Sequence, residues 1–371
     1  MALAHALKVH HQTSIDLDGR NELSLLKRQL ARFAGLAAGP TRFVVWTFFV
    51  LLGIGFANSS MAQVANWERT VAAGKKEGRV VVYSVAVPAL NDRIRADFES
   101  LHPGYSVAIV RLFGPTLRSK VEQERQIGAD GADVIINSDA QWVQAGGREG
   151  WFNAPVGPAR TAWPNNYLIP GGAVTFALDV VVIGYNTKLA SIGSYQDLLK
   201  PEYKGKIAVQ LNSAAVVMAY YKWMEDTLGA DYVKRLAAQQ PKIDNSVPNA
   251  QSVAAGEVVA TAYAVPSMLA ELASQGAPIK WVVPRPASGF AFQVGALKWS
   301  RRPNASQVFL DYLMSPRGQA VIVGEKLLAS PLPGIEGSLD LSNVAVVDTA
   351  KWTPESMNAY KKTWDALFLA K

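Results

Sequence analysis

The stretch RVVVYSVAVPALNDRIRADFESLHPGYSVAIVRLFGPT, residues 79–116, decides the fold class. Its apolar run Val80–Tyr83 is typical of a buried strand. Apolar side chains then recur at helical spacing between residues 90 and 101, and a second β-branched run follows over residues 106–112. A strand, a helix and a strand in this order predict two parallel strands joined by a right-handed crossover.

The carboxyl ends of these two strands predict where a ligand binds. In open α/β sheets, ligands bind beyond the carboxyl ends of the strands. Ser84 ends the first strand, and residues 113–116 follow the second. Each position precedes a predicted helix, whose unpaired N–H groups can hold an anion.

The rest of the chain predicts two lobes. Strands and helices alternate after residue 62, which favours an α/β protein with a mainly parallel sheet in each lobe. A long apolar strand over residues 173–186 and a returning strand over residues 290–297 are expected to connect the lobes and to form a hinge. We therefore assign residues 63–178 and 296–371 to lobe 1, and residues 179–295 to lobe 2.

The first 62 residues are typical of a cleavable signal peptide. The apolar run Phe43–Phe56 follows several basic residues and is shorter than the roughly 20 residues of a membrane-spanning helix. Ser60–Ala62 is a small-x-small cleavage site, so the mature chain would begin at Gln63. An uncleaved membrane anchor is the alternative. The signal peptide predicts a periplasmic protein.

The composition excludes several function classes. The chain has no cysteine, which excludes disulfides and thiolate chemistry, and three of its four histidines lie in the leader. A histidine-based triad or a multi-histidine metal site is therefore not expected, and we predict no cofactor. The net charge is +7, but the mature chain has no Lys/Arg block, so we predict no nucleic-acid binding.

Several stretches of the mature chain share their order and spacing with one protein family. They are GRVVVYSVAVP (78–88), GADVIINSDAQWV (131–143), SYQDLLKPEYKGKIAV (194–209), AAGEVVATAY (254–263) and YLMSPRGQAVI (312–322). In these stretches the chain resembles bacterial extracellular solute-binding proteins with the type II periplasmic binding protein fold. The branch it resembles includes ferric-iron, thiamine, polyamine and phosphonate binders.

The resemblance implies a transport function. It implies the periplasmic substrate-binding component of an ABC importer, which captures a small organic and anionic solute by hinge closure. Its partners would be that solute and the ABC permease and ATPase complex at the inner membrane, and we expect a monomer. An enzyme on a similar two-lobed fold is an alternative, but we find no nucleophile-elbow or phosphate-loop motif.

A ferric-iron-binding transport protein is the second alternative. Ferric members of the family carry adjacent tyrosines after the Gly-Glu strand, and their phenolates bind the metal. In this chain that position is occupied by Val265 and Pro266. The pair Tyr220–Tyr221 lies in a predicted helix, where core packing is the favoured role. The sequence therefore argues against iron.

The candidate ligand-binding residues stand mostly at strand ends of both lobes. The guanidinium of Arg111 suits a carboxylate or phosphate, with a salt bridge as the alternative. The hydroxyl and amide residues, and Asp139 above all, can instead cap the helices that follow them. Tyr263 and Phe290 would form aromatic walls, with core packing as the alternative. The candidates are Ser84, Arg111, Phe113, Thr116, Ser138, Asp139, Asn212, Ser213, Ser246, Tyr263 and Phe290.

Overall fold

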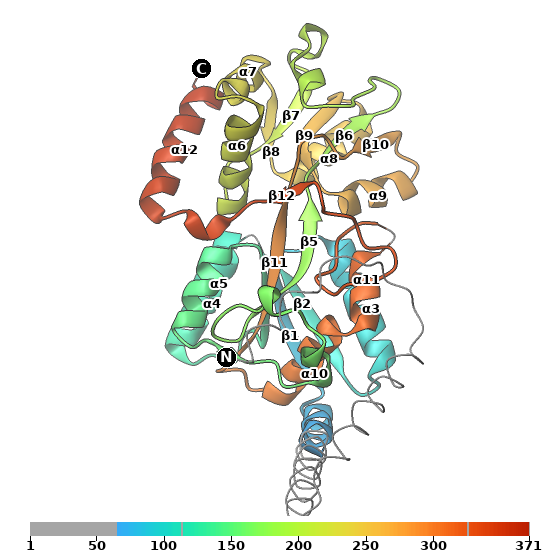
Figure 1. Cartoon of the computed structure of the whole chain (residues 1–371), viewed down its shortest axis with the longest axis vertical. Helices are drawn as coiled ribbons and strands as arrows, with labels where there is room; N and C mark the ends of the chain where they lie inside the picture. The colour runs from blue at the N-terminus through green and yellow to red at the C-terminus, as the bar shows by residue number, and fades with distance from the viewer. Residues whose placement is uncertain (1–64, 113, 325, 371) are drawn as a thin grey trace, which may run out of the picture. The chain divides into compact units, whose positions relative to one another are not determined.

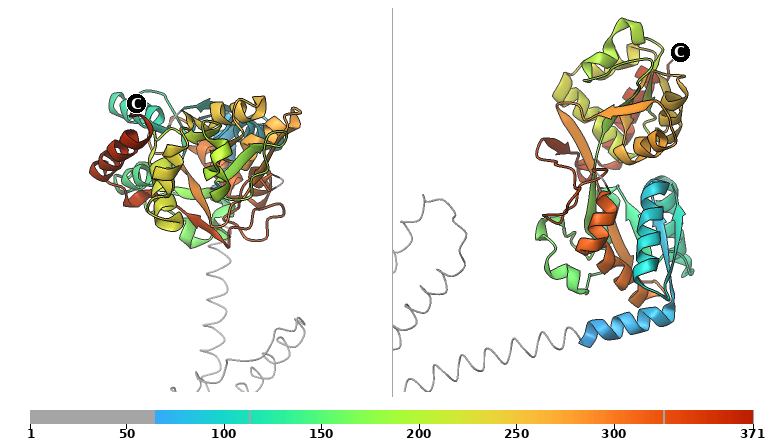
Figure 2. Two further views of the ribbon diagram at one scale, coloured as in Figure 1. Left: turned by 90° about the horizontal axis from the view of Figure 1, so that it is seen from above. Right: turned by 90° about the vertical axis from the view of Figure 1, so that its right-hand side faces the viewer.

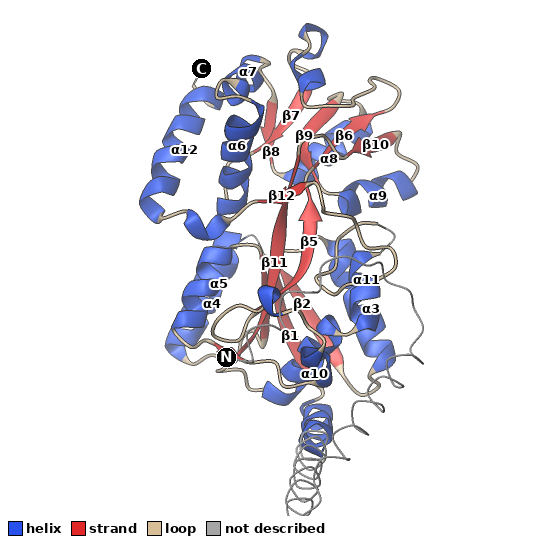
Figure 3. Cartoon of the chain, in the orientation of Figure 1, coloured by secondary structure: helices blue, strands red, loops and turns tan. Residues whose placement is uncertain are grey.

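The computed structural model describes residues 65–112, 114–324 and 326–370. Residues 66–371 group into one compact unit, which contains two β-sheets with helices packed around them (Figures 1 and 3). We call the part around the seven-stranded sheet lobe 1 and the part around the five-stranded sheet lobe 2. The predicted signal peptide lies outside the described residues. Among the helices described, none has the length and apolar character needed to cross a membrane.

The predicted strand-helix-strand unit forms the centre of lobe 1. Strand β1 (Arg79–Ser84) pairs in parallel with β2 (Ser106–Arg111), and helix α3 (Pro88–Leu101) connects them. Strand β3 (Val134–Asn137) pairs in parallel with the other edge of β1. The apolar face of α3 is buried as predicted, except that Leu101, in the last turn, is exposed. The sheet order is β12-β11-β3-β1-β2, where β11 spans Ala287–Leu297 and β12 spans Val344–Val346. Strands β4 (Phe152–Asn153) and β5 (Val174–Val180) are also paired to β11.

The other elements of lobe 1 surround this sheet. Thr116 was a candidate cap for α4, but it does not cap this helix. The helix already begins at Gly114, and Thr116 lies exposed in its first turn. A further helix, described from residue 65, ends at residue 77. The remaining elements are α4 (Gly114–Ile127), α5 (Ala140–Arg148), β4 (Phe152–Asn153), η1 (Pro158–Thr161), η2 (Asn165–Tyr167), α10 (Pro303–Met314) and α11 (Pro316–Val323).

Lobe 2 is built on a sheet with the order β10-β6-β9-β7-β8. Tyr220 and Tyr221 pack in its core as predicted, and their hydroxyls donate to the carbonyl oxygens of Ala262 and Gln210. Its elements are β6 (Val182–Asn186), η3 (Gln196–Leu199), η4 (Pro201–Tyr203), β7 (Ile207–Gln210), α6 (Ala215–Leu228), α7 (Tyr232–Ala238), β8 (Lys242–Asp244), α8 (Ser246–Ala255), β9 (Ala260–Ala264), α9 (Pro266–Ser274) and β10 (Ile279–Val282).

The two expected connections between the lobes are present, but the sheets divide at other residues. The predicted long strand is split at Val181 into β5 (Val174–Val180) of lobe 1 and β6 of lobe 2. The return lies between β10 and β11 (Ala287–Leu297), at residues 283–286. Residues 287–295, which we expected in lobe 2, pair with β12, β5 and β3, so they belong to the sheet of lobe 1.

The C-terminal segment connects the lobes a third time. Strand β12 (Val344–Val346) pairs with β11 in lobe 1, and η5 (Thr349–Lys351) follows. Helix α12 (Pro354–Phe368) then packs beside α6 and α7 of lobe 2 (Figures 1 and 2). The ring of Trp364 in α12 lies 5.6 Å from that of Tyr221 in α6. We expected this helix in lobe 1, whereas its aromatic face packs on lobe 2.

Gly289 is required where β5 and β11 approach each other. A Cβ atom at this position would lie 2.3 Å from the carbonyl oxygen of Asp179, which is a backbone atom. We expect Gly289→Ala to lower the stability by about 1–3 kcal/mol, because the paired strands must separate. Gly193→Ala is the control, since its Cβ would meet its nearest neighbour at 3.6 Å. Thermal melts that are equal for both variants would show that the two strands accommodate a side chain at residue 289.

Candidate functional site

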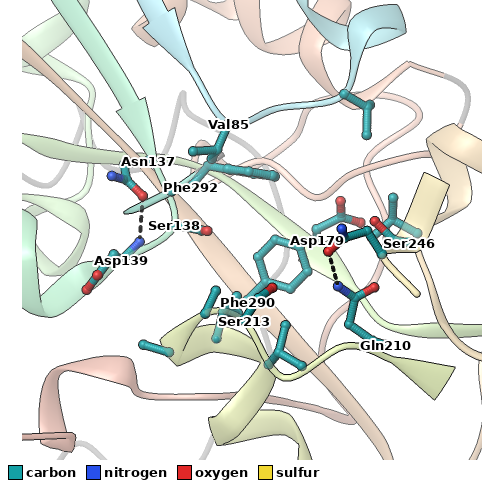
Figure 4. A pocket seen from close by; sticks show the side chains of 18 of the residues that line it. Val85, Asn137, Ser138, Asp139, Asp179, Gln210, Ser213, Ser246, Phe290 and Phe292 are labelled. Carbon is teal, nitrogen blue, oxygen red and sulfur yellow. Dashed lines mark hydrogen bonds between the residues drawn. The ribbon is translucent and has the colours of Figure 1, made fainter. Parts of the chain in front are cut away.

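A cleft of about 180 Å³ lies between the lobes, lined by residues at the carboxyl ends of their strands. Lobe 1 contributes residues that follow β1, β2 and β3, and lobe 2 contributes residues at the ends of β7, β8 and β9. Strands β5 and β11 line it where they approach the connections between the lobes. Figure 4 shows Phe290 of β11 between Ser138 of lobe 1 and Ser213 of lobe 2.

Six of the helices that the structure describes begin at this cleft. In a parallel sheet each strand leads into a helix, so the starts of the helices gather where the strands end. In the part of the chain that the structure describes, the N-cap side chains of α3, α6, α8 and α9 form no hydrogen bond to their helices. Helix N-termini carry a partial positive charge, so the cleft favours an anion. The residues that line the cleft at these six starts are Val87, Gly114, Asp139, Ala214, Asn245 and Val265.

Two arginines of lobe 1 add positive charge to the cleft. Arg111, at the end of β2, is exposed there, and its Nε atom donates to the carbonyl oxygen of Ala86 at 3.1 Å. Arg118 of α4 forms an ion pair with Asp139 at 2.7 Å. The same carboxylate accepts the N–H of Trp142 and caps α5, which confirms the capping role that we favoured for it.

Asp179 is a buried carboxyl group in the cleft. It lies next to the last residue of β5, opposite Phe290 of β11, and only 2% of its surface is exposed. Its Oδ1 atom accepts the N–H of Val180 at 2.9 Å, and no ion pair to it is present among the described residues. Burial raises the pKa of the Asp179 carboxyl well above its ordinary value, because the charged form loses its hydration.

Residues 79–325 match the family model described as bacterial extracellular solute-binding protein. The chain belongs to this family. The match begins at β1 and covers both lobes through α11, so it includes the strand ends and helix starts that form the cleft. No curated protein matches the chain.

Solved structures show the fold of this solute-binding protein. The substrate binding protein of the ABC transporter from Agrobacterium tumefaciens has a TM-score of 0.69 and 14% identity, over 79% of this chain and 96% of that chain. AfuA from Actinobacillus pleuropneumoniae, with fructose-6-phosphate bound, has a TM-score of 0.63 and 20% identity, over 79% of this chain and 99% of that chain. Iron-bound HitA from Pseudomonas aeruginosa has a TM-score of 0.59 and 16% identity, over 77% of this chain and 99% of that chain. The fold is the type II periplasmic binding protein fold, as the resemblance implied.

The structure brings seven of the candidate residues together. Ser84 lies outside the cleft lining, because its buried hydroxyl donates to Asn91 at 2.9 Å. Thr116 faces away on the surface of α4, and Asn212 is buried beside the cleft but does not line it. Phe113 lies outside the described residues. The candidates that line the cleft are Arg111, Ser138, Asp139, Ser213, Ser246, Tyr263 and Phe290.

Sequence reasoning missed six polar residues of the cleft and one ring: Arg118, Asn137, Asp179, Gln210, Asn245, Ser267 and Phe292. Asn137 and Gln210 end β3 and β7, and each has a buried amide atom without a hydrogen-bond partner in the described part of the chain. Asn245 and Phe292 also line the cleft. The strand-end rule could have found the amides. For Asp179 the signal was a lone acid within an apolar run.

Asp179→Asn tests the burial of this carboxyl. A raised pKa means that the folded protein binds the proton more tightly than the unfolded chain, so stability falls as pH rises above the ordinary carboxyl pKa. Asparagine removes this loss and can still accept the Val180 N–H. We expect the variant to melt above the wild type at pH 8, with a difference that narrows toward pH 4. A variant that melts lower at pH 8 would show that the ionised carboxylate is stabilised.

Proposed function

We propose that this protein is the periplasmic binding component of an ABC importer and captures a small organic anion between its lobes. Its membership of the solute-binding family supports the transport role. The main support for an anionic ligand is the convergence of six helix N-termini on one cleft that also contains Arg111 and Arg118. An anion there would meet partial or full positive charge from both lobes.

Closure of the lobes would couple binding to transport. Arg111 and Ser138 come from lobe 1, whereas Ser213, Ser246 and the start of α6 come from lobe 2. A ligand that bonds to both sets favours the closed form by the difference between its affinities for the closed and open forms. The permease and the ATPase would then receive the ligand from a closed monomer. The family role includes no catalytic step, and we assign none.

Ferric iron is a weaker candidate for the cargo. A trivalent cation needs several anionic oxygen ligands, and the described residues contain no group of three His, Cys, Asp or Glu side chains that could hold a metal. Among the described residues, the carboxyl groups that line the cleft are those of Asp139, which pairs with Arg118, and of the buried Asp179. Tyr263 is followed by Ala264 and Val265 rather than by a second phenol.

Arg111→Gln tests the anionic ligand. Organic phosphates and carboxylates that stabilise the wild type against heat are expected to bind about tenfold to a hundredfold more weakly to this variant, since a charged hydrogen bond contributes about 1.5–3 kcal/mol. Arg235→Gln, an exposed change of equal charge on α7, should leave the affinity unchanged. Titration calorimetry measures both. Equal affinities in the wild type and Arg111→Gln would place the site elsewhere.

Iron addition tests the alternative cargo. We expect no visible ferric–phenolate absorption band when ferric citrate is added to the purified protein, because Tyr263 is the one tyrosine among the described residues that line the cleft. A band that is lost in Tyr263→Phe would establish iron binding through this phenol. Phenylalanine is the suitable replacement, because Tyr263 is only 6% exposed and alanine would also remove core packing.

Export is tested by the N-terminus of the mature protein. We infer that residues 1–62 direct the chain to the periplasm and are removed. N-terminal sequencing of the periplasmic fraction is expected to begin at Gln63. An intact leader in the membrane fraction would instead identify an anchored protein.

A further inference from the structure

We propose that the solute is a zwitterion whose cationic group is bound by Asp179 together with the rings of Tyr263, Phe290 and Phe292. Its anionic group would bind the helix starts and Arg111. This inference rests on the proposed function and names the ligand class for the same cleft.

The carboxyl group of Asp179 provides the first observation. It lines the cleft, yet 98% of the residue surface is buried. Its one hydrogen bond comes from the adjacent Val180 N–H, and in the described part of the chain its other oxygen has no donor. Buried carboxylates in proteins are ordinarily paired with a cation or several donors. A cleft that leaves this oxygen without a partner is suited to a ligand that supplies one.

The aromatic rings around Asp179 provide the second observation. Phe290 is its direct neighbour across the β5–β11 ladder, and Phe292 lies two residues further along β11. The centroids of these two rings are 5.3 Å apart in an edge-to-face arrangement. Tyr263 is the penultimate residue of β9 in lobe 2, and all three rings line the cleft. Aromatic faces attract ammonium and guanidinium groups, and a carboxylate beside them adds charge.

The two halves of the cleft have opposite electrostatic character. The helix starts and the two arginines favour negative charge, whereas Asp179 and the rings favour positive charge. A simple anion would leave the Asp179 carboxyl protonated and without a charged partner. A simple cation would leave the helix starts unused. A molecule with both charges is bound by both parts.

Matched probe molecules test the ligand class. Each set contains a zwitterion, its anion and its cation: phosphoethanolamine, ethyl phosphate and ethanolamine; phosphocholine, ethyl phosphate and choline; 4-aminobutyrate, butyrate and butylamine. We expect at least one zwitterion to bind the full mature protein about tenfold to a hundredfold more tightly than both of its partners. Titration calorimetry measures the affinities. If no zwitterion binds more tightly than its matched anion, the inference is wrong.

Asp179→Asn separates this inference from the proposed function. The variant should bind the preferred zwitterion about tenfold to a hundredfold more weakly and bind the matched anion as the wild type does. Asp311→Asn is the control, because Asp311 is a partly buried carboxyl of lobe 1 outside the cleft that accepts the Ala159 N–H.

The outcomes distinguish two failures. If anions bind as tightly as zwitterions and bind weakly to Arg111→Gln, the inference of a zwitterionic ligand is wrong, and the proposed anion-binding site is retained. Cations that bind as tightly as zwitterions, and that depend on Asp179, would overturn both the zwitterion and the anionic ligand. An unchanged zwitterion affinity in Asp179→Asn would show that Asp179 does not bind the cationic group.

Discussion

The antiparallel ladder between β5 and β11 is the constraint on which the rest of this structure depends. These strands pair over residues 174–180 and 289–294, and each leads to the other lobe within a few residues. The ladder therefore fixes where the lobes meet. It also fixes part of the cleft, because Asp179 and Phe290 face each other within it. The element that leads to the hinge thus also contributes side chains to the cleft, and in the proposed closure these would stay with lobe 1 when lobe 2 rotates.

The electrostatics of the cleft follow from the parallel strands. A parallel connection needs a crossover helix, so every parallel strand that ends at the cleft is followed by a helix that begins there. The positive N-termini accumulate without any single basic residue being responsible. This topology places partial positive charge at the cleft although Arg118 is already paired with Asp139. Asp179 departs from the pattern, because it lies on an antiparallel strand that no helix start follows.

The sequence predicts elements that depend on local pattern. The spacing of Leu90, Ile94 and Phe98 predicts the buried face of α3, and the order of strands and helices predicts parallel pairing. The change of sheet at Val181 is not predictable in this way, because the apolar run continues through it and only the partners differ. For α12, the amphipathic pattern defines the packing face, but the partner, Tyr221, lies far away in the chain.

The site is likewise predictable at the level of strand ends but not of side-chain direction, because successive side chains at a strand end point to opposite sides. Ser138 and Ser213 line the cleft, whereas Ser84 turns inward to Asn91. These choices depend on the register and on neighbouring helices, which the sequence of a single strand does not contain.

The third connection between the lobes limits how the cleft can close. Strand β12 is held on β11 in lobe 1, and Thr349 accepts the N–H of Ala140 at the start of α5. Helix α12 is held on lobe 2 through Trp364, and its Met357 lines the cleft. A rotation of lobe 2 must therefore bend the chain at Val181, at residues 283–286 and between β12 and α12 together. Three connections that share one rotation leave fewer directions of motion than two, so the closing lobes meet the ligand along a defined path.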